Sequence, residues 1–377
     1  MCLAELPSSW RTPSGQEWAA KEYDSELRSE TQQREERAAY EELTLNADQQ
    51  IAFDAVKSMI DDPSAIDSKN VVFVDGPAGT GKTFLYRKVL HYVRMTGRIA
   101  LAVAFSGIAA LLLPGGRTAH SRFRLPVPIP SEGCCCNVKA QFAVARLLRD
   151  AAVIVWDEAP MCHKEMVSAV DKCLQELLGC SNSFGGKIIL LGGDWRQIPP
   201  VTRYVERDAV SAISMCSLPF WKSSSLIHCR LTKNMRARED VSYADFCKVV
   251  GDGLLPSAES SQADDRLSSA CISLPPAISA PVDYSAADLL AWVYDGFTNL
   301  LPAQMPQFYE SRCVLAPTNE AADTLNAQMY CMLSPKPLCI ARYNVCARSK
   351  TDWRFVFCAQ VFKFPNDLHA LPGYWWC

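Results

Sequence analysis

The chain has no surplus of positive charge: 38 Lys and Arg stand against 41 Asp and Glu, and the formal net charge is −3. A protein that binds nucleic acid through its whole surface is therefore excluded, and any site for a polyanion has to be a local basic patch. The chain also lacks an uninterrupted run of about 18 apolar residues, so the sequence predicts no membrane-spanning segment.

Cysteine spacing excludes a second class of protein. The chain contains 17 cysteines but no Cys-x-x-Cys pair, the spacing that many zinc sites use. The first 18 residues, MCLAELPSSWRTPSGQEW, do not have the basic head and apolar run of a secretory leader. We therefore expect reduced thiols in an intracellular protein. The nucleus is the preferred compartment, and the mitochondrion is the alternative.

Short apolar runs alternate with helix-length amphipathic stretches from residue 45 onward. This alternation predicts an α/β fold, in which a mostly parallel sheet is covered by helices on both faces. The predicted strands are Val71–Asp75, Ile99–Phe105, Val153–Trp156 and Lys187–Leu191, and the predicted helices include Lys82 to about Met95 and residues 164–178.

Changes in composition divide the chain into parts. The N-terminal part is rich in charged residues and glutamine and is predicted to be a solvated helix or arm. A stretch rich in Ser, Ala, Pro and Asp predicts a linker. A strand at Arg312–Ala316 and a helix at Thr318–Tyr330 predict the start of a second domain. The predicted parts are a charged arm (1–44), a first domain (45–250), a linker (251–284), the start of a second domain (285–330) and an unassigned tail (331–377).

A phosphate-binding loop is predicted between the first strand and its helix. The segment GPAGTGKT, residues 76–83, matches G-x-x-x-x-G-K-[ST] in the strand–helix context that this motif requires. Backbone N–H groups of such a loop surround phosphate oxygens, and the helix N-terminus adds a favourable dipole. Lys82 would reach the β- and γ-phosphates, and the Thr83 hydroxyl would ligate Mg²⁺. The predicted nucleotide-binding residues are Gly76, Gly79, Thr80, Gly81, Lys82 and Thr83.

Two acids follow the third predicted strand. The run VIVWDE ends in Asp157 and Glu158. At a strand end in a phosphate-binding fold, Asp157 would lie beside the magnesium, and Glu158 would polarise a water near the γ-phosphate. A consecutive pair of acids favours hydrolysis over nucleotide binding alone.

Two later segments offer further groups for phosphate chemistry. LLGGDWRQIPPV places the amide of Gln197 after a strand, where it can donate a hydrogen bond to the γ-phosphate; a plain turn with structural prolines is the alternative. LTKNMR offers Arg236 as a cation for transition-state charge, and a surface salt bridge is the alternative.

One segment is locally basic. Between Ser106 and Arg149 there are six Lys or Arg and a single acid, Glu132. Within it, RTAHSRF (117–123) interleaves cations with a hydroxyl, an imidazole and an aromatic ring. Cations for phosphates and a ring for a base suit a single nucleic-acid strand, so we expect Arg117, Arg122 or Arg124 near phosphates and Phe123 or His120 at a base. The alternative is a basic surface loop with a buried Phe123.

Six segments of the chain match one known family: GPAGTGKT, SGIAALLLPGGRTAHSRF, WDEAPM, FGGKIILLGGDWRQIPPV, LTKNMR and APTNEAADTLN. They resemble the petite-integration-frequency (Pif-type) DNA helicases of superfamily one, and particularly the helicase domains carried by Helitron transposons. The resemblance covers about Leu45 to Asn326. It implies an ATP-dependent 5′-to-3′ DNA helicase with two RecA-like domains, the second of them incomplete here, that acts on single-stranded DNA and duplex junctions in repair, recombination and telomere maintenance.

The resemblance also assigns roles to single residues. Gln49 would read the adenine, Lys82 and Thr83 would hold the phosphates and Mg²⁺, and Asp157 and Glu158 would serve the metal and the water. Gln197 would couple the γ-phosphate to neighbouring parts, and Arg236 would be an arginine finger. The family's DNA-contacting segments include Ser106, Gly107, Thr118, His120, Phe123, Thr318 and Asn319, to which the basic pattern adds Arg117.

The sequence departs from the family pattern in two places. Trp195 stands where the family usually has phenylalanine, and the family's later second-domain motifs are not recognisable after Asn326. The chain is therefore expected to be a fragment, the product of an imperfect gene model, or a degenerate copy. An active helicase is the leading hypothesis, and a helicase relic that binds ATP and DNA without unwinding is the second. A phosphate-loop kinase is the third; it requires a phosphoacceptor pocket in place of the basic segment.

Overall fold

The computed structural model describes residues 21, 23–62, 69–130, 133–197, 199–200, 210–223, 226–254, 275–276, 279–281, 283–297, 300, 304–316 and 318–333. The chain divides into two compact units, and the division falls after residue 255. Among the described residues, no helix combines the length and the apolar character that a membrane crossing requires.

Six parallel strands make up the sheet of the first unit. They are β1 (Val71–Asp75), β2 (Ile99–Ala104), β3 (Arg117–Thr118), β4 (Ala151–Asp157), β5 (Ile188–Gly193) and β6 (Leu226–Arg230). Their order across the sheet is β3-β2-β4-β5-β1-β6, and each pairing is parallel. The predicted α/β fold is confirmed, and the four predicted strands are found within one or two residues of their expected ends.

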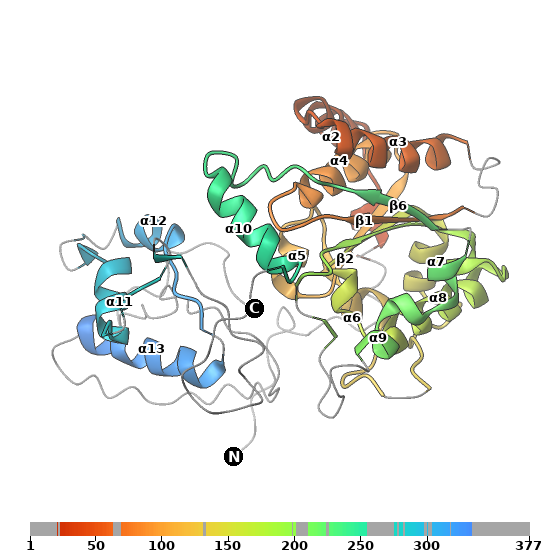
Figure 1. Cartoon of the computed structure of the whole chain (residues 1–377). Helices are drawn as coiled ribbons and strands as arrows, with labels where there is room; N and C mark the ends of the chain where they lie inside the picture. The colour runs from red at the N-terminus through yellow and green to blue at the C-terminus, as the bar shows by residue number, and fades with distance from the viewer. Residues whose placement is uncertain are drawn as a thin grey trace, which may run out of the picture. The chain divides into compact units, whose positions relative to one another are not determined.

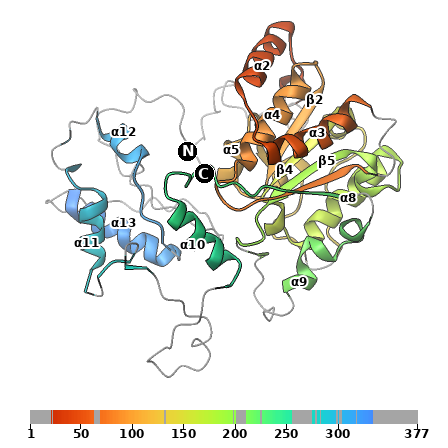
Figure 2. The same cartoon turned by 45° about the horizontal axis from the view of Figure 1, so that its top comes forward.

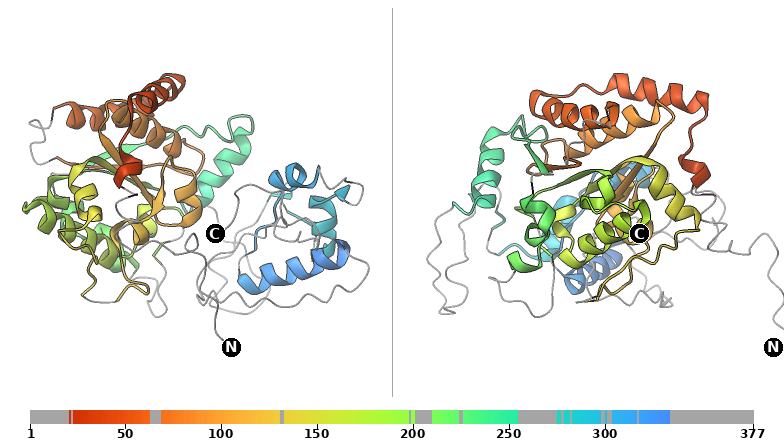
Figure 3. Two further views of the ribbon diagram at one scale, coloured as in Figure 1. Left: turned by 180° about the vertical axis from the view of Figure 1, so that it is seen from behind. Right: turned by 90° about the vertical axis from the view of Figure 1, so that its right-hand side faces the viewer.

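Helices cover both faces of this sheet (Figures 1 and 3). On one face α3 (Ala47–Asp61) and α4 (Lys82–Arg94) pack against Val72 and Val74 of β1. On the other face α7 (Ala143–Asp150) and α8 (Lys164–Leu178) share a core with Val71 and Phe73. Successive side chains of a strand point to opposite faces, so β1 serves both layers and is apolar throughout Val71–Val74. Further helices of this unit are α2 (Glu30–Glu42), α5 (Gly107–Leu111), α6 (Ala119–Phe123), α9 (Val210–Ile213) and α10 (Val241–Gly251).

The strand register aligns the carboxyl ends of the strands along one edge of the sheet. Asp75 of β1 is paired with Gly193 of β5. Ala104 of β2 is paired with Asp157 of β4 on one side and with Thr118 of β3 on the other. The loops that follow these strands therefore leave the sheet side by side, which is where parallel α/β folds bind ligands.

The charged N-terminal segment is docked onto the helical layer. Helix α2 runs beside α4 (Figure 2) and has no fully buried side chain; the half-buried Tyr40 ring packs against Phe53 and Tyr92, and polar contacts add to this packing. Lys88 of α4 donates hydrogen bonds to the carbonyl oxygens of Tyr40 and Leu43, and its ammonium group lies 3.5 Å from the centre of the Tyr40 ring. His91 of α4 pairs with Glu36 of α2. The predicted solvated helix is thus present, but it is attached to the first unit.

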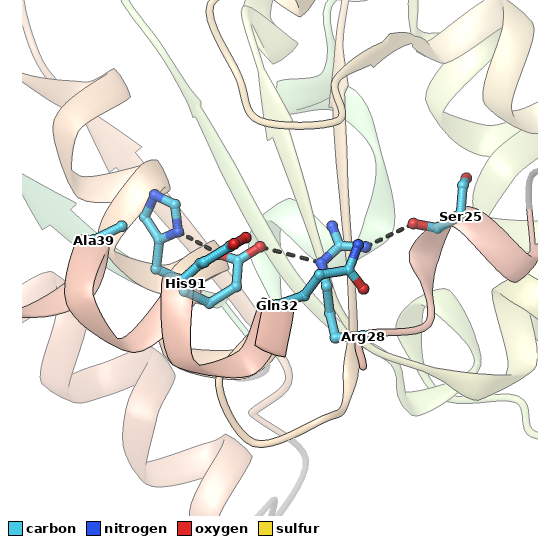
Figure 4. A pocket seen from close by; sticks show the side chains of 7 residues that line it. Ser25, Arg28, Gln32, Ala39 and His91 are labelled. Atoms are coloured by element: carbon cyan, nitrogen blue, oxygen red, sulfur yellow. Dashed lines mark hydrogen bonds and ion pairs between the residues drawn. The ribbon is translucent and has the colours of Figure 1, made fainter. Parts of the chain in front are cut away.

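Figure 4 shows Arg28 and His91 turned toward one polar hollow beside α2. Two residues before Arg28 in the sequence, Glu26 is 5% exposed and lies between two buried arginines. Its carboxylate is 3.1 Å from Arg122 of α6 and 3.5 Å from Arg94 of α4. Arg94 also donates to the carbonyl oxygens of Ala100 and Pro114, each at 2.9 Å. This buried ion cluster joins the N-terminal segment to the phosphate-loop helix and to the basic segment.

The described part of the second unit contains three helices. α11 (Ala286–Val293), α12 (Met305–Glu310) and α13 (Asn319–Leu333) surround a small core that includes Leu290 and Met329. Helix α13 confirms the helix expected at Thr318–Tyr330. The prediction of a strand at Arg312–Ala316 is wrong. The segment contains a single bridge residue, Val314, whose side chain is buried in this small core. An apolar residue in a short run can be buried by helices as readily as by a sheet.

The ion cluster gives a stability prediction. We expect Glu26→Ala to lower the free energy of unfolding by about 3–5 kcal/mol, because two buried guanidinium groups lose their carboxylate. Urea unfolding followed by tryptophan fluorescence measures this change. Glu42→Ala, at the exposed end of α2, is the control and should stay within about 0.5 kcal/mol of the parent. Equal stability of Glu26→Ala and the parent would contradict the role given to the cluster.

Candidate nucleotide site and nucleic-acid segment

The phosphate-binding loop connects β1 to α4 and depends on glycine at two positions. Gly79 and Gly81 have φ angles of 86° and 82°, in the left-handed region. A Cβ at Gly79 would lie 2.5 Å from Oδ1 of Asn234, so a side chain there would also displace the LTKNMR segment. The loop ends at the N-terminus of α4, where the free N–H groups and the helix dipole favour an anion.

Gln49 lies directly against this loop. Its side chain is 4% exposed, and its Nε2 donates to the carbonyl oxygens of Thr80 at 3.1 Å and Gly81 at 3.3 Å. Its Oε1 accepts a hydrogen bond from the backbone N–H of Asn46 at 3.0 Å, because both residues form the capping box of α3. Both ends of the amide are thus bonded within the protein, and one Oε1 lone pair is left for the predicted contact with adenine.

Lys82 is surrounded by carboxylates. Its Nζ donates to the carbonyl oxygens of Gly76 and Pro77. Burial lowers the pKa of Lys82, and four nearby acids oppose that decrease, namely Asp194, Asp157, Asp75 and Glu158. A single ammonium group among four acids leaves the site rich in oxygen ligands, and the arrangement suits a phosphate group that arrives together with a divalent cation.

The two predicted acids lie at the end of β4. Asp157 is 6% exposed, and burial raises its pKa to about 6 even though the backbone N–H of Glu158 donates to it at 2.9 Å. Thr83 is the second residue of α4, directly after Lys82. One carboxylate and one hydroxyl fit Mg²⁺, which prefers oxygen ligands and keeps several waters and phosphate oxygens around it. Thr83 and Asp157 are therefore the residues that would hold the metal.

The loop after β5 is bonded to the phosphate-binding loop. Asp194 is 7% exposed and accepts a hydrogen bond from the backbone N–H of Ala78 at 3.1 Å. Gln197 is exposed, and its Nε2 lies 3.4 Å from Oδ2 of Asp194. Gln197 is thus connected to the nucleotide loop through Asp194, and its contact with a γ-phosphate stays a prediction.

The LTKNMR segment also lies on the phosphate-binding loop. The backbone N–H of Met235 donates to the carbonyl oxygen of Gly79 at 2.8 Å, and Oδ1 of Asn234 accepts from the N–H groups of Arg236 and Ala237. Arg236 is exposed, and its Cβ is adjacent to Gly79. The role of Arg236 as a cation for a phosphate held by the loop stays a prediction.

The basic segment is divided between the core and the surface. Phe123 is 1% exposed, and its ring packs 5.4 Å from that of Trp156. Arg122 is fully buried and paired with Glu26. These two positions favour the structural alternative for Phe123, and they remove Arg122 from the expected phosphate contacts, since a guanidinium group in a buried ion cluster cannot also face solvent.

Other residues of the segment are half-buried or exposed, and one of them contacts an acid of the nucleotide site. The Ser106 hydroxyl donates to Oε2 of Glu158 at 2.9 Å, and Gly107 is exposed. Thr118 caps α6 by accepting from the N–H of Ser121, and burial lowers the pKa of the half-buried His120. Arg117 is half-buried in β3, the strand at the edge of the sheet.

The two residues predicted for the second domain lie together in the second unit. The Thr318 hydroxyl accepts from the backbone N–H of Ala321 at 3.2 Å, and Asn319 is the first residue of α13. Their expected contact with DNA stays a prediction.

The region that holds these residues matches a known protein family. The model of the PIF1-like helicase family matches residues 44–260, which is more than half of the chain. The chain belongs to the PIF1-like helicase family. The match includes the phosphate-binding loop, both acids, the segment after β5 and LTKNMR, and it ends in the predicted linker.

Relatives in the PIF1-like family are distant. The chain is 29% identical over 168 residues to the ATP-dependent DNA helicase Pif1 of a Psychrobacter species, covering 44% of this chain and 25% of the relative. It is 29% identical over 215 residues to the Pif1 helicase of Bdellovibrio bacteriovorus, covering 56% of this chain and 43% of the relative. The chain thus matches less than half the length of either relative.

A solved structure supports the fold. The chain resembles the Pif1 helicase of Bacteroides in complex with ADP-AlF3 and single-stranded DNA, with a TM-score of 0.53 at 22% identity. The likeness covers 77% of this chain and 58% of that structure. It supports the RecA-like fold that the resemblance implied.

Two PIF1-like site residues were not predicted from the sequence. Asp194 follows two glycines at the end of β5, and Asn234 stands two residues before Arg236. Asp194 accepts a hydrogen bond from the backbone N–H of Ala78, and Oδ1 of Asn234 lies beside Gly79, so each meets a loop more than a hundred residues away in the chain. The Gly-Gly-Asp strand end was a usable signal for Asp194, because a carboxylate at a strand end of a parallel sheet lies at the ligand edge.

The acid at 158 gives a kinetic prediction. We expect Glu158→Gln to bind ATP as the parent does while hydrolysing it about 10²–10⁴-fold more slowly, because an amide cannot accept the proton of the attacking water. Lys82→Ala should also remove hydrolysis, since its charge stabilises the transferring phosphoryl group. Phosphate release and binding of a fluorescent ATP analogue measure the two effects. Glu176→Gln, on the exposed side of α8, is the control, and turnover by Glu158→Gln at the parent rate would refute the assignment.

Arg236 should affect the rate far more than the affinity for ATP. Its charge is needed mainly in the transition state, and such arginines contribute on the order of 10³–10⁵-fold in related phosphoryl transfers. Steady-state kinetics of Arg236→Ala should show a large decrease in kcat with little change in ATP binding, whereas Arg238→Ala, exposed two residues later, should behave as the parent. An Arg236→Ala rate within about threefold of the parent would leave Arg236 a surface cation.

The two rings of the basic segment should respond differently to truncation. Phe123→Ala should destabilise the protein by about 3–5 kcal/mol, as expected for a buried aromatic residue, and leave DNA affinity unchanged in the folded fraction. His120→Ala should keep the melting temperature and weaken binding of single-stranded DNA by about 1–3 kcal/mol. Thermal unfolding and fluorescence anisotropy with a labelled oligonucleotide measure both. Weaker DNA binding by a folded Phe123→Ala protein, with His120→Ala unchanged, would reverse the assignment.

Proposed function

We propose that this chain is the ATP-hydrolysing part of a DNA helicase that moves 5′ to 3′ along single-stranded DNA. One observation carries the proposal: the nucleotide residues and the basic segment meet at a single edge of one sheet, and the Ser106 hydroxyl bonds to Glu158 at 2.9 Å. Family membership supports the helicase class.

In this proposal, the nucleotide site binds ATP through the loop at residues 76–83 and positions it for hydrolysis. Lys82 neutralises charge on the β- and γ-phosphates, and Glu158 accepts a proton from the attacking water. Mg²⁺, held by Thr83 and Asp157, would supply further positive charge at the phosphates. Arg236 stabilises charge in the transition state, and Gln197 senses the γ-phosphate from the loop after β5.

The Ser106–Glu158 hydrogen bond offers a route by which DNA changes the rate of hydrolysis. Ser106 caps α5 by accepting from the backbone N–H of Ala109 at 3.2 Å, and the neighbouring Gly107 is exposed. A DNA phosphate bound at the start of α5 would compete for the Ser106 hydroxyl. The Glu158 carboxylate would then be released from Ser106 and free to accept a hydrogen bond from the attacking water. DNA binding is therefore expected to stimulate hydrolysis.

The polarity and the biological role rest on the resemblance to the family. The relatives are named ATP-dependent DNA helicases, and a Pif1 helicase from Bacteroides was solved with single-stranded DNA. We propose that the present chain acts on single strands and duplex junctions. We also propose that it has a role in repair, recombination or telomere maintenance inside the cell.

The test measures hydrolysis and unwinding with the same preparation. We expect ATP hydrolysis that increases on addition of single-stranded DNA, and ATP-dependent opening of a fluorescent fork with a 5′ tail but not of one with a 3′ tail. Lys82→Ala is the control for both activities. DNA-stimulated hydrolysis without opening of either fork would favour the alternative of a protein that binds ATP and DNA without unwinding. Hydrolysis indifferent to DNA would contradict the proposed function.

A further inference from the structure

A line of charged contacts connects the phosphate-binding loop to the last helix of the first unit. Asp194 accepts from the backbone N–H of Ala78 at 3.1 Å and from that of Arg196 at 3.1 Å. The guanidinium group of Arg196 lies 3.6 Å from Oδ1 of Asp194. Its Nε donates to Oδ1 of Asp252 at 2.9 Å. One arginine is thus shared between a carboxylate at the nucleotide loop and a carboxylate at the end of α10.

The C-terminal end of helix α10 has space for the side chain of this arginine. Asp252 is its C-cap residue, and Gly251 is its last residue. A Cβ at Gly251 would lie 2.6 Å from Cδ of Arg196, so the aliphatic part of the arginine packs where a larger residue would not fit. Figures 1 and 2 both show α10 on the side of the sheet where α5 lies, which is the edge reached by the carboxyl ends of the strands.

The contact matters because apolar side chains anchor α10 only weakly: Phe246 and Val249 are half-buried. None of its side chains is buried. The Arg196 and Asp252 side chains are 16% and 28% exposed, so their ion pair is partly shielded from water and stronger than an exposed pair. The position of the C-terminal end of α10 therefore depends strongly on the arginine, and the first unit ends within a few residues of Asp252.

We propose that Arg196 and Asp252 are positioning residues that transmit the state of the nucleotide loop to α10. This inference rests on the proposed function, because it requires ATP at the phosphate-binding loop. A phosphate held by Lys82 and the loop amides changes the charge around Asp194, since Asp194 both accepts from Ala78 and lies near the Lys82 ammonium group. The attraction of Asp194 for Arg196 then changes relative to that of Asp252. The two carboxylates compete for one guanidinium group, so α10 moves or stiffens with each nucleotide state.

A purely structural role makes a different prediction. An ion pair that only stabilises α10 would protect its backbone amides equally with and without nucleotide. An ion pair that transmits the nucleotide state would make the protection of these amides from hydrogen exchange depend on bound nucleotide. Hydrogen–deuterium exchange of the α10 amides, with and without Mg²⁺ and a non-hydrolysable ATP analogue, separates the two roles and requires no catalytic activity.

In the parent chain we expect the nucleotide analogue to change the exchange rate of the α10 amides by about 5- to 30-fold, which lies in the lower part of the roughly 5- to 150-fold range of coupling between sites in proteins. Arg196→Met keeps the aliphatic part but removes the charge, and it should abolish this difference while the analogue still binds. Arg196→Lys should restore part of it. Lys57→Met removes one member of an exposed ion pair on α3 and is the matched control. The inference would be overturned if the exchange rate of the α10 amides in the parent did not change when the analogue binds. It would also be overturned if Arg196→Met showed the same change in exchange rate as the parent.

A double-mutant cycle gives the second test. Arg196→Met and Asp252→Asn should each lower kcat for DNA-stimulated hydrolysis about 5- to 30-fold with KM for ATP within twofold, and the double variant should be no worse than either single variant. Additive decreases would show that the two residues act separately and would overturn the inference. If the parent neither binds the analogue nor hydrolyses ATP, the proposed function fails together with the inference. If the parent shows DNA-stimulated hydrolysis and α10 does not respond, only the inference fails.

Discussion

The parallel pairing of β1 with β5 is the constraint on which the rest of the site depends. Their register places Asp75 opposite Gly193, and the backbone N–H of Gly76 donates to the carbonyl oxygen of Gly193 at 3.2 Å. The phosphate-binding loop and the loop after β5 therefore leave the sheet next to each other, and Asp194 can accept from Ala78. A shift of one residue would turn every side chain of the strand to the other face and would separate these two loops.

Charge is distributed across this edge so that one binding event affects several elements. Lys82 lies among acids from β1, β4 and the loop after β5. Glu158 is bonded to Ser106 at the start of α5, and Arg196 is shared between the nucleotide loop and α10. In the proposed function, a phosphate at Lys82 would change the electrostatic environment of both the basic segment and α10.

Local sequence was sufficient to predict the parts of the fold that carry their own pattern. β1 is an uninterrupted apolar run before a glycine-rich loop, so the strand and the loop after it could be predicted together. The burial of Phe123 and the ion pair of Arg122 could not be predicted, because packing against Trp156 and pairing with Glu26 depend on residues far away in the chain. The strand β6 was missed for a similar reason: LIHCR has a mixed pattern, and only its pairing with β1 makes it a strand.

A crystal structure with Mg²⁺ and a non-hydrolysable ATP analogue tests the central claim most directly. The account predicts the triphosphate in the loop at residues 76–83, with Nζ of Lys82 moved from the Gly76 and Pro77 carbonyl oxygens to the β- and γ-phosphates. It also predicts the metal between the Thr83 hydroxyl and the Asp157 carboxylate. A nucleotide bound elsewhere, or a Lys82 side chain that stays on the loop carbonyl oxygens beside a bound triphosphate, would contradict the account.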